Sequence, residues 1–171
     1  MPPRKKPADS LSHIDARGRA RMVDVGAKPP VRREALAEGF FVARRETLDA
    51  VMAGNLPKGE ALPVARLAGI LAAKQVDTLI PLCHTLPLDF VNVDFERAAP
   101  DRIRITAVAA ITARTGVEME ALTAVSLAAL TLYDMTKAID KELRIEGVRL
   151  VKKTKADSPS RETDTRVSGN T

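Results

Sequence analysis

The chain has 171 residues, a length typical of one domain that can bury a sizeable core. Hydrophobic residues make up 45% of the sequence but aromatic residues only 3%, so alanine and aliphatic side chains must fill the interior. The net charge of +5 favours an anionic partner. Because RNA-binding sheets need exposed aromatic rings for bases to stack on, the composition argues against a nucleic-acid partner.

The only cysteine, Cys83, excludes a disulfide within the chain. No apolar run approaches the length of a membrane span, and the basic N-terminus lacks the apolar core of a secretion signal. We therefore expect a cytoplasmic protein with no membrane partner.

Both ends of the sequence lack an apolar period. Residues 1–20 are rich in proline and charge, and residues 154–171 are mostly polar. We predict that these ends are disordered tails, because such segments bury too little apolar surface to order themselves. Residues 21–153 are then the single folded domain.

The first half of this domain alternates between strand and helix patterns. Residues 22–25 alternate like a short strand, and residues 31–43 favour a strand, although their alanine-rich stretches leave a helix open. Residues 45–53 and 60–74 have helical spacing, the second with apolar residues that predict a buried helix. Gly69 inside that helix indicates a close approach of another element.

The second half predicts a hairpin, a long helix and a final strand. Residues 88–97 and 102–112 alternate on either side of a proline-containing turn, which is typical of a β-hairpin. Residues 117–141 form the longest and most apolar predicted helix, and residues 143–152 the last strand. This order resembles the split βαβ pattern of a ferredoxin-like sandwich. We predict an α+β fold, with helices on one face of an antiparallel sheet and another subunit on the other face.

Two polar clusters interrupt loops of the predicted domain. Lys58 lies just before a helix start, where the helix N-terminus would attract an anion; a solvated surface lysine is the alternative. Cys83 and His84 lie in an apolar loop interrupted by prolines. His84 could bind a substrate or shuttle a proton, or it could be a buried histidine with satisfied hydrogen bonds. No spaced pair of cysteines or histidines accompanies it, so we predict no metal site.

The long helix carries a third cluster. Asp134 and Lys137 lie one turn apart, so they are either an ordinary ion pair or an acid–base pair in a pocket, and both interpretations remain open. Glu120 lies about 21 Å from Asp134 along a continuous helix. A small ligand cannot easily contact both within one subunit. We therefore predict pockets at a subunit interface.

Several segments resemble the cyclic pyranopterin monophosphate synthase family, also called molybdenum cofactor biosynthesis protein C. They are residues 22–25 (MVDV), Lys58 with Gly59, residues 79–84 (LIPLCH), residues 115–124 (TGVEMEALTA) and residues 133–138 (YDMTKA). The resemblance implies a lyase of ferredoxin-like fold, assembled as a hexamer that is a trimer of dimers. It also implies a nucleotide substrate, 3′,8-cyclo-7,8-dihydro-GTP, and the products cyclic pyranopterin monophosphate and pyrophosphate. No organic cofactor is implied, although Mg²⁺ could accompany the triphosphate.

Carried over by position, the resemblance implies catalytic roles for Asp134, Lys137 and Lys58. It implies substrate contacts for Leu82, Cys83, His84, Met119 and Glu120, with Glu118 close by, and a triphosphate site drawn from Lys28, Arg33, Lys74 and Lys153. The chain departs from the family pattern at Thr85, Arg114 and Thr136, none of which removes a proposed catalytic group. A non-catalytic module that binds nucleotide phosphates and a basic nucleic-acid binder remain the competing hypotheses.

Overall fold

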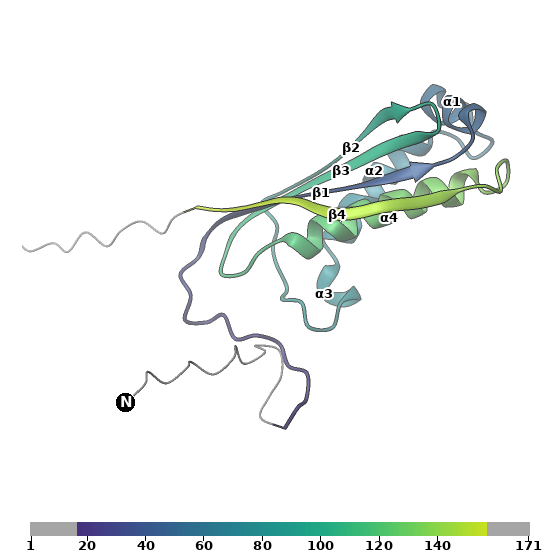
Figure 1. Ribbon diagram of the computed structural model, residues 1–171. Coiled ribbons are helices and arrows are strands. Elements are labelled where there is room, and N and C mark those ends of the chain that lie inside the picture. Colours follow the sequence, from purple (N-terminus) through teal and green to yellow (C-terminus); the bar gives the residue numbers. More distant parts are fainter. Residues whose placement is uncertain (1–16, 157–171) are drawn as a thin grey trace, which may run out of the picture.

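Four long segments with alternating apolar residues form strands, which pair into one antiparallel sheet with the helices on one of its faces (Figure 1). The computed structural model describes residues 17–156. In chain order, the elements are β1 (Val31–Val42), α1 (Arg45–Ala53), α2 (Ala61–Ala73), α3 (Val76–Leu79), β2 (Phe90–Ala99), β3 (Arg102–Ala113), α4 (Glu118–Thr136) and β4 (Arg144–Lys155). The strand order β2-β3-β1-β4 confirms the predicted α+β, ferredoxin-like fold.

Strand β1 lies inside the sheet and pairs with β3 on one side and β4 on the other. Strands β2 and β3 form the predicted hairpin. Isoleucines and alanines at every second position of β3, including Ile103 and Ile105, are buried against the helices. The alternation that predicted the strands therefore also selects the face that packs against the core.

Helix α4 packs its alanine-rich side into this core. Ala121, Ala124 and Ala128 are fully buried at helical spacing, and small side chains allow the helices and sheet to approach closely. The approach is tightest at Gly69 of α2, where an added β-carbon would lie 2.7 Å from the carbonyl oxygen of Ala124. The predicted close approach at Gly69 is thus confirmed.

The structure corrects several predicted boundaries. Residues 22–25 form no strand: they have no regular secondary structure and lie outside the sheet. Helix α3 was not predicted. Helix α4 ends at Thr136, rather than Lys141, because the next residues turn back to bring the side chain of Asp140 to the start of α1. Strand β4 continues through Lys155, two residues past the predicted end of the domain.

Helix α2 is only half buried, which corrects the prediction of a buried helix. Its core-facing side, which includes Ala65 and Ala72, packs inward, whereas Leu67 is 58% exposed and Leu71 48% exposed. A helix that covers one face of a sheet has an outer side, and leucines on that side face solvent in the single chain. Most of the two predicted tails, residues 1–16 and 157–171, lies outside the described residues.

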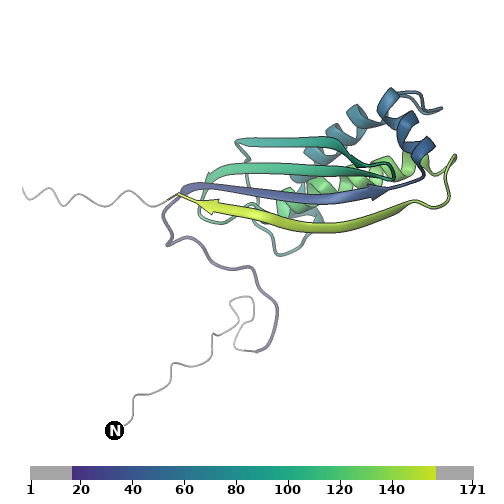
Figure 2. The same ribbon diagram turned by 45° about the horizontal axis from the view of Figure 1, so that its top comes forward.

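Figure 2 shows that the opposite face of the sheet has no helix over it. Glu38 lies on this face and is nevertheless buried, because Arg104 and Arg149 each donate a hydrogen bond of 2.8 Å to its carboxylate from Nε. These hydrogen bonds, from Arg149 first and then Arg104, hold the pKa of Glu38 below its usual value. That another subunit covers this face stays a prediction.

Candidate functional site

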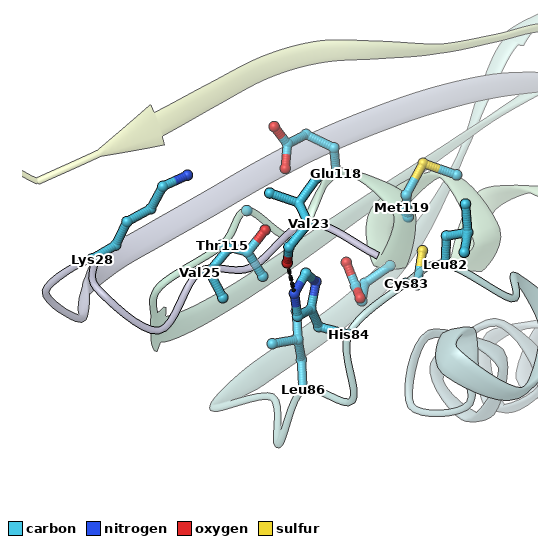
Figure 3. A pocket seen from close by; sticks show the side chains of 12 residues that line it. Val23, Val25, Lys28, Leu82, Cys83, His84, Leu86, Thr115, Glu118 and Met119 are labelled. Atoms are coloured by element: carbon cyan, nitrogen blue, oxygen red, sulfur yellow. Dashed lines mark hydrogen bonds between the residues drawn. The ribbon is translucent and has the colours of Figure 1, made fainter. Parts of the chain in front are cut away.

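A cavity of about 470 Å³ lies where the N-terminal segment, the loop after α3 and the start of α4 meet (Figure 3). It brings together seven of the predicted substrate-binding residues: Lys28, Leu82, Cys83, His84, Glu118, Met119 and Glu120. Val23, Val25, Leu86, Thr115 and Gly116 complete its lining. Segments that are far apart in the sequence therefore converge at one end of α4.

His84 is oriented by the N-terminal segment. Its Nε2 lies 2.9 Å from the carbonyl oxygen of Val23. A carbonyl oxygen only accepts, so Nε2 must carry the proton of this hydrogen bond. In the neutral ring, Nδ1 is then the nitrogen that can accept a proton. The segment at residues 22–25 thus fixes the tautomer of His84 instead of extending the sheet.

Glu120 is a buried carboxyl group in the cavity wall. Its side chain comes from the first turn of α4, and the residue is 4% exposed. The pKa of Glu120 is raised to about 7, chiefly by burial and also by the negative charges of Glu118 and Asp77, while a hydrogen bond from its own backbone N–H opposes the shift. A carboxyl group with this pKa can give or take a proton near neutral pH.

The loop that carries Cys83 and His84 is tied to helix α3. The hydroxyl of Thr85 donates a hydrogen bond of 2.6 Å to Asp77. Burial, and then the charges of Glu120 and Asp77, raise the pKa of the Cys83 thiol, so Cys83 is not an activated nucleophile here. Asp77 was not predicted as a site residue. It lies in α3, a short helix that the sequence pattern did not predict.

A second cavity, of about 320 Å³, adjoins the first and shares Gly116 and Glu118 with it. Basic side chains of the sheet line it, namely Arg33 of β1 and Lys153 and Lys155 of β4. The guanidinium of Arg33 is fixed by a 3.1 Å hydrogen bond from Nε to the carbonyl oxygen of Ala113. Lys155 was missed because the sequence placed it in the tail.

Two further predicted residues lie elsewhere in the fold. Lys74 is exposed at the end of α2 and lines neither cavity. Lys58, from the loop after α1, reaches the C-terminal end of α4 instead of the cavity at its N-terminal end. No group of three or more His, Cys, Asp and Glu side chains within residues 17–156 is arranged to hold a metal ion.

Lys58, Asp134 and Lys137 form an exposed charge cluster. The Nζ of Lys58 lies 3.0 Å from Oδ2 of Asp134, and the Nζ of Lys137 lies 2.6 Å from Oδ1. Hydrogen bonds from Lys137 and then Lys58 lower the pKa of Asp134 to about 2, and the bond to Asp134 raises the pKa of Lys137. In the single chain, both groups therefore stay charged at neutral pH, as in an ordinary ion pair.

This cluster lies at the end of α4 away from Glu120. The two ends of the 19-residue helix are about 27 Å apart at 1.5 Å per residue. The two halves of the predicted site thus do not meet within one chain. The acid–base roles of Asp134 and Lys137 stay predictions.

The fold and the cavities define a ferredoxin-like α+β protein in which a cavity lined by a buried carboxyl group and a histidine adjoins a basic one. The family model described as the MoaC family matches residues 22–156. Three proteins bearing the name cyclic pyranopterin monophosphate synthase are 59%, 55% and 56% identical to the chain, from Novosphingobium aromaticivorans, Chloroflexus aggregans and Corynebacterium efficiens, respectively. Their matches cover 85%, 85% and 84% of this chain and 92%, 88% and 92% of the relatives. The chain therefore belongs to the MoaC family, as its resemblance predicted, and it is an enzyme of the lyase class.

Proposed function

We propose that the chain converts 3′,8-cyclo-7,8-dihydro-GTP to cyclic pyranopterin monophosphate and pyrophosphate, a step in molybdenum cofactor biosynthesis. The relatives' shared name supports the product. The observation that carries the proposal is the junction of the two cavities at Gly116 and Glu118. One cavity holds groups that exchange protons, and the other holds cations suited to a triphosphate.

The first cavity would receive the purine-derived ring. Opening the imidazole ring and closing the pterin ring both require proton transfers, which groups with a pKa near the working pH perform best. Glu120 has a pKa of about 7, and we assign it these transfers. Nδ1 of His84 would be a further proton acceptor, because the bond to Val23 engages only Nε2. Lys28 also lines this cavity, where its positive charge would attract the negatively charged ligand.

The second cavity would receive the triphosphate. Forming the cyclic phosphate requires a sugar hydroxyl to attack the α-phosphorus, which breaks its bond to the departing pyrophosphate. The hydroxyl loses its proton, and negative charge develops on the leaving group. Arg33, Lys153 and Lys155 are placed to neutralise that charge. Any Mg²⁺ would arrive with the triphosphate, and the proposal needs no organic cofactor.

The charge cluster of Lys58, Asp134 and Lys137 would act on the ligand of a neighbouring protomer. The length of α4, which separates the cluster from Glu120, supports this assignment. A homohexamer built as a trimer of dimers would supply such contacts at subunit interfaces. Burial at that interface and the nearby phosphates would change the protonation of Asp134 and Lys137. We place the enzyme in the cytoplasm, with no nucleic-acid partner.

The helices in the described part of the chain are too short or too polar to cross a bilayer.

The direct test incubates the purified protein with the cyclised GTP substrate and measures released pyrophosphate and the pterin product. Tight binding without turnover would instead support the non-catalytic nucleotide-binding module. The interface proposal has its own test, in which inactive Glu120→Gln and Asp134→Asn chains are mixed and allowed to exchange subunits. Recovered turnover supports shared sites, whereas no recovery in verified mixed oligomers rejects them.

A further inference from the structure

Glu118 occupies the boundary between the two cavities. It is the first residue of α4 and lines both cavities together with Gly116. Figure 3 shows its side chain at the edge of the first cavity, with the carboxylate directed away from His84. A nucleotide with its ring in the first cavity and its triphosphate in the second would therefore lie next to Glu118.

The carboxylate of Glu118 is paired with a cation of the second cavity. Its Oε1 lies 3.1 Å from Nζ of Lys153. Within residues 17–156, Arg33 and Lys155 form no ion pair with a carboxylate, and the guanidinium of Arg33 donates hydrogen bonds to the main-chain carbonyl oxygens of Ala113 and Arg114. Among the three cations of this cavity, Lys153 is therefore the one already neutralised by the protein.

A carboxylate and a phosphate oxygen make the same kind of charge-assisted hydrogen bond to a lysine. They cannot both hold Lys153 at close range without repelling each other. We propose that Glu118 is a carboxylate placeholder, which occupies Lys153 in the empty site and must leave it when a polyphosphate binds. The inference rests on the proposed function, because it takes the second cavity as the phosphate site.

The local backbone allows this movement. The ion pair is partly exposed, with the Lys153 side chain 67% exposed and that of Glu118 30% exposed, so water can replace the contact. Gly116 supplies the space in which the carboxylate lies, because a β-carbon there would overlap Oε2 of Glu118. Gly116 does not have a positive φ, so alanine fits its backbone, and the three atoms nearest to its β-carbon would all belong to the carboxylate of Glu118.

The placeholder predicts that removing the carboxylate strengthens anion binding. Calorimetric titration of the full-length protein with inorganic pyrophosphate at fixed ionic strength measures this. We expect Glu118→Gln to bind pyrophosphate about three- to tenfold more tightly than the wild type, since one competing ion pair and its repulsion are removed. Gly116→Ala should change affinity in the same direction while keeping the charge of Glu118.

Glu34 provides the matched control, because it lines the same cavity and forms no ion pair among the described residues. Glu34→Gln removes an equal charge and should change affinity by less than about twofold through long-range repulsion alone. In a Lys153→Gln background, the gain from Glu118→Gln should shrink. Both results together assign the effect to the Glu118–Lys153 pair.

The inference is overturned if Glu118→Gln binds pyrophosphate no more tightly than the wild type, or if neither protein binds it. An equal gain in Glu34→Gln, or an undiminished gain without Lys153, also overturns it. Turnover of the cyclised GTP substrate by the wild type is measured separately. Wild-type turnover with no gain in Glu118→Gln rejects the placeholder alone, whereas a gain without wild-type turnover rejects the proposed reaction alone.

Discussion

Asp140 is a buried carboxylate whose loss should destabilise the fold. It follows α4, and its side chain is fully buried. Oδ2 accepts hydrogen bonds of 2.9 Å from the backbone N–H of Arg44 and from the hydroxyl of Thr47, and Oδ1 accepts one of 2.9 Å from the N–H of Glu142. Asp140 thus caps the start of α1 from a distant part of the chain.

The magnitude follows from the donors that Asp140→Ala leaves without a partner. Hydrogen bonds to a charged group contribute about 1.5–3 kcal/mol each, and they are not additive. Breaking a buried charged network costs about 3–5 kcal/mol, so we expect a loss of about 3–4 kcal/mol. For a folded domain of this size, that lowers the midpoint of thermal unfolding by roughly 10 °C.

Graded variants separate the contributions. Asp140→Asn keeps one acceptor oxygen and should cost about 2 kcal/mol, and Thr47→Val, which removes one donor, about 1 kcal/mol. Arg44→Ala keeps the backbone N–H and removes a half-exposed guanidinium, so it should cost less than about 1 kcal/mol. Urea and thermal unfolding at one protein concentration measure all four.

The pH dependence gives a second test of the same network. Burial alone would raise the pKa of Asp140, but hydrogen bonds from Glu142, Arg44 and Thr47 outweigh it and lower the pKa below its usual 3.8. Its stabilisation is therefore present above pH 3.8 and is lost as the pH falls through the lowered value. The wild type and Asp140→Asn should converge in acid. A cost below about 1 kcal/mol for Asp140→Ala at pH 7 would refute the reasoning.

Three further outcomes are expected. The pKa of Glu120 is raised from 4.5 to about 7, so its neutral form stabilises the fold at low pH, and this is lost as the pH rises through 7. Between pH 4 and 8, the free energy of unfolding of Glu120→Gln should rise by up to about 3 kcal/mol relative to that of the wild type, as measured by urea unfolding. A difference between the two proteins that does not change with pH would contradict the raised pKa. Gly69→Ala should cost about 1–3 kcal/mol because its β-carbon would meet the Ala124 carbonyl oxygen, whereas Gly26→Ala in an exposed loop should cost little; equal losses would reject the close approach. Nitrogen-15 NMR of neutral His84 should show the proton on Nε2, as its bond to Val23 requires, and a proton on Nδ1 would contradict that hydrogen bond.

The sequence by itself determined most of the long elements and the family. Apolar residues that recur every two positions predicted the β2–β3 hairpin, and those that recur about every 3.6 positions predicted α1 and the long α4. These periods can be read from the sequence because the local geometry of a strand or helix decides which of its side chains share a face. Conspicuous motifs such as residues 115–124 identified the family, and the family model matches them. The same motifs named most residues of the first cavity before their positions were known.

Only the tertiary structure decided which of those residues meet. Lys58 contacts Asp134 across 76 positions of sequence, and Val23 orients His84 across 61. The same packing buries Glu120 and raises its pKa to about 7. Asp134, on the same helix, has its pKa lowered to about 2, first by Lys137 one turn away and then by Lys58 from a distant loop. The burial of Glu120 and the approach of Lys58 depend on segments that are remote along the chain, so no local pattern encodes them, whereas the pairing of Asp134 with Lys137 follows from their spacing on one helix.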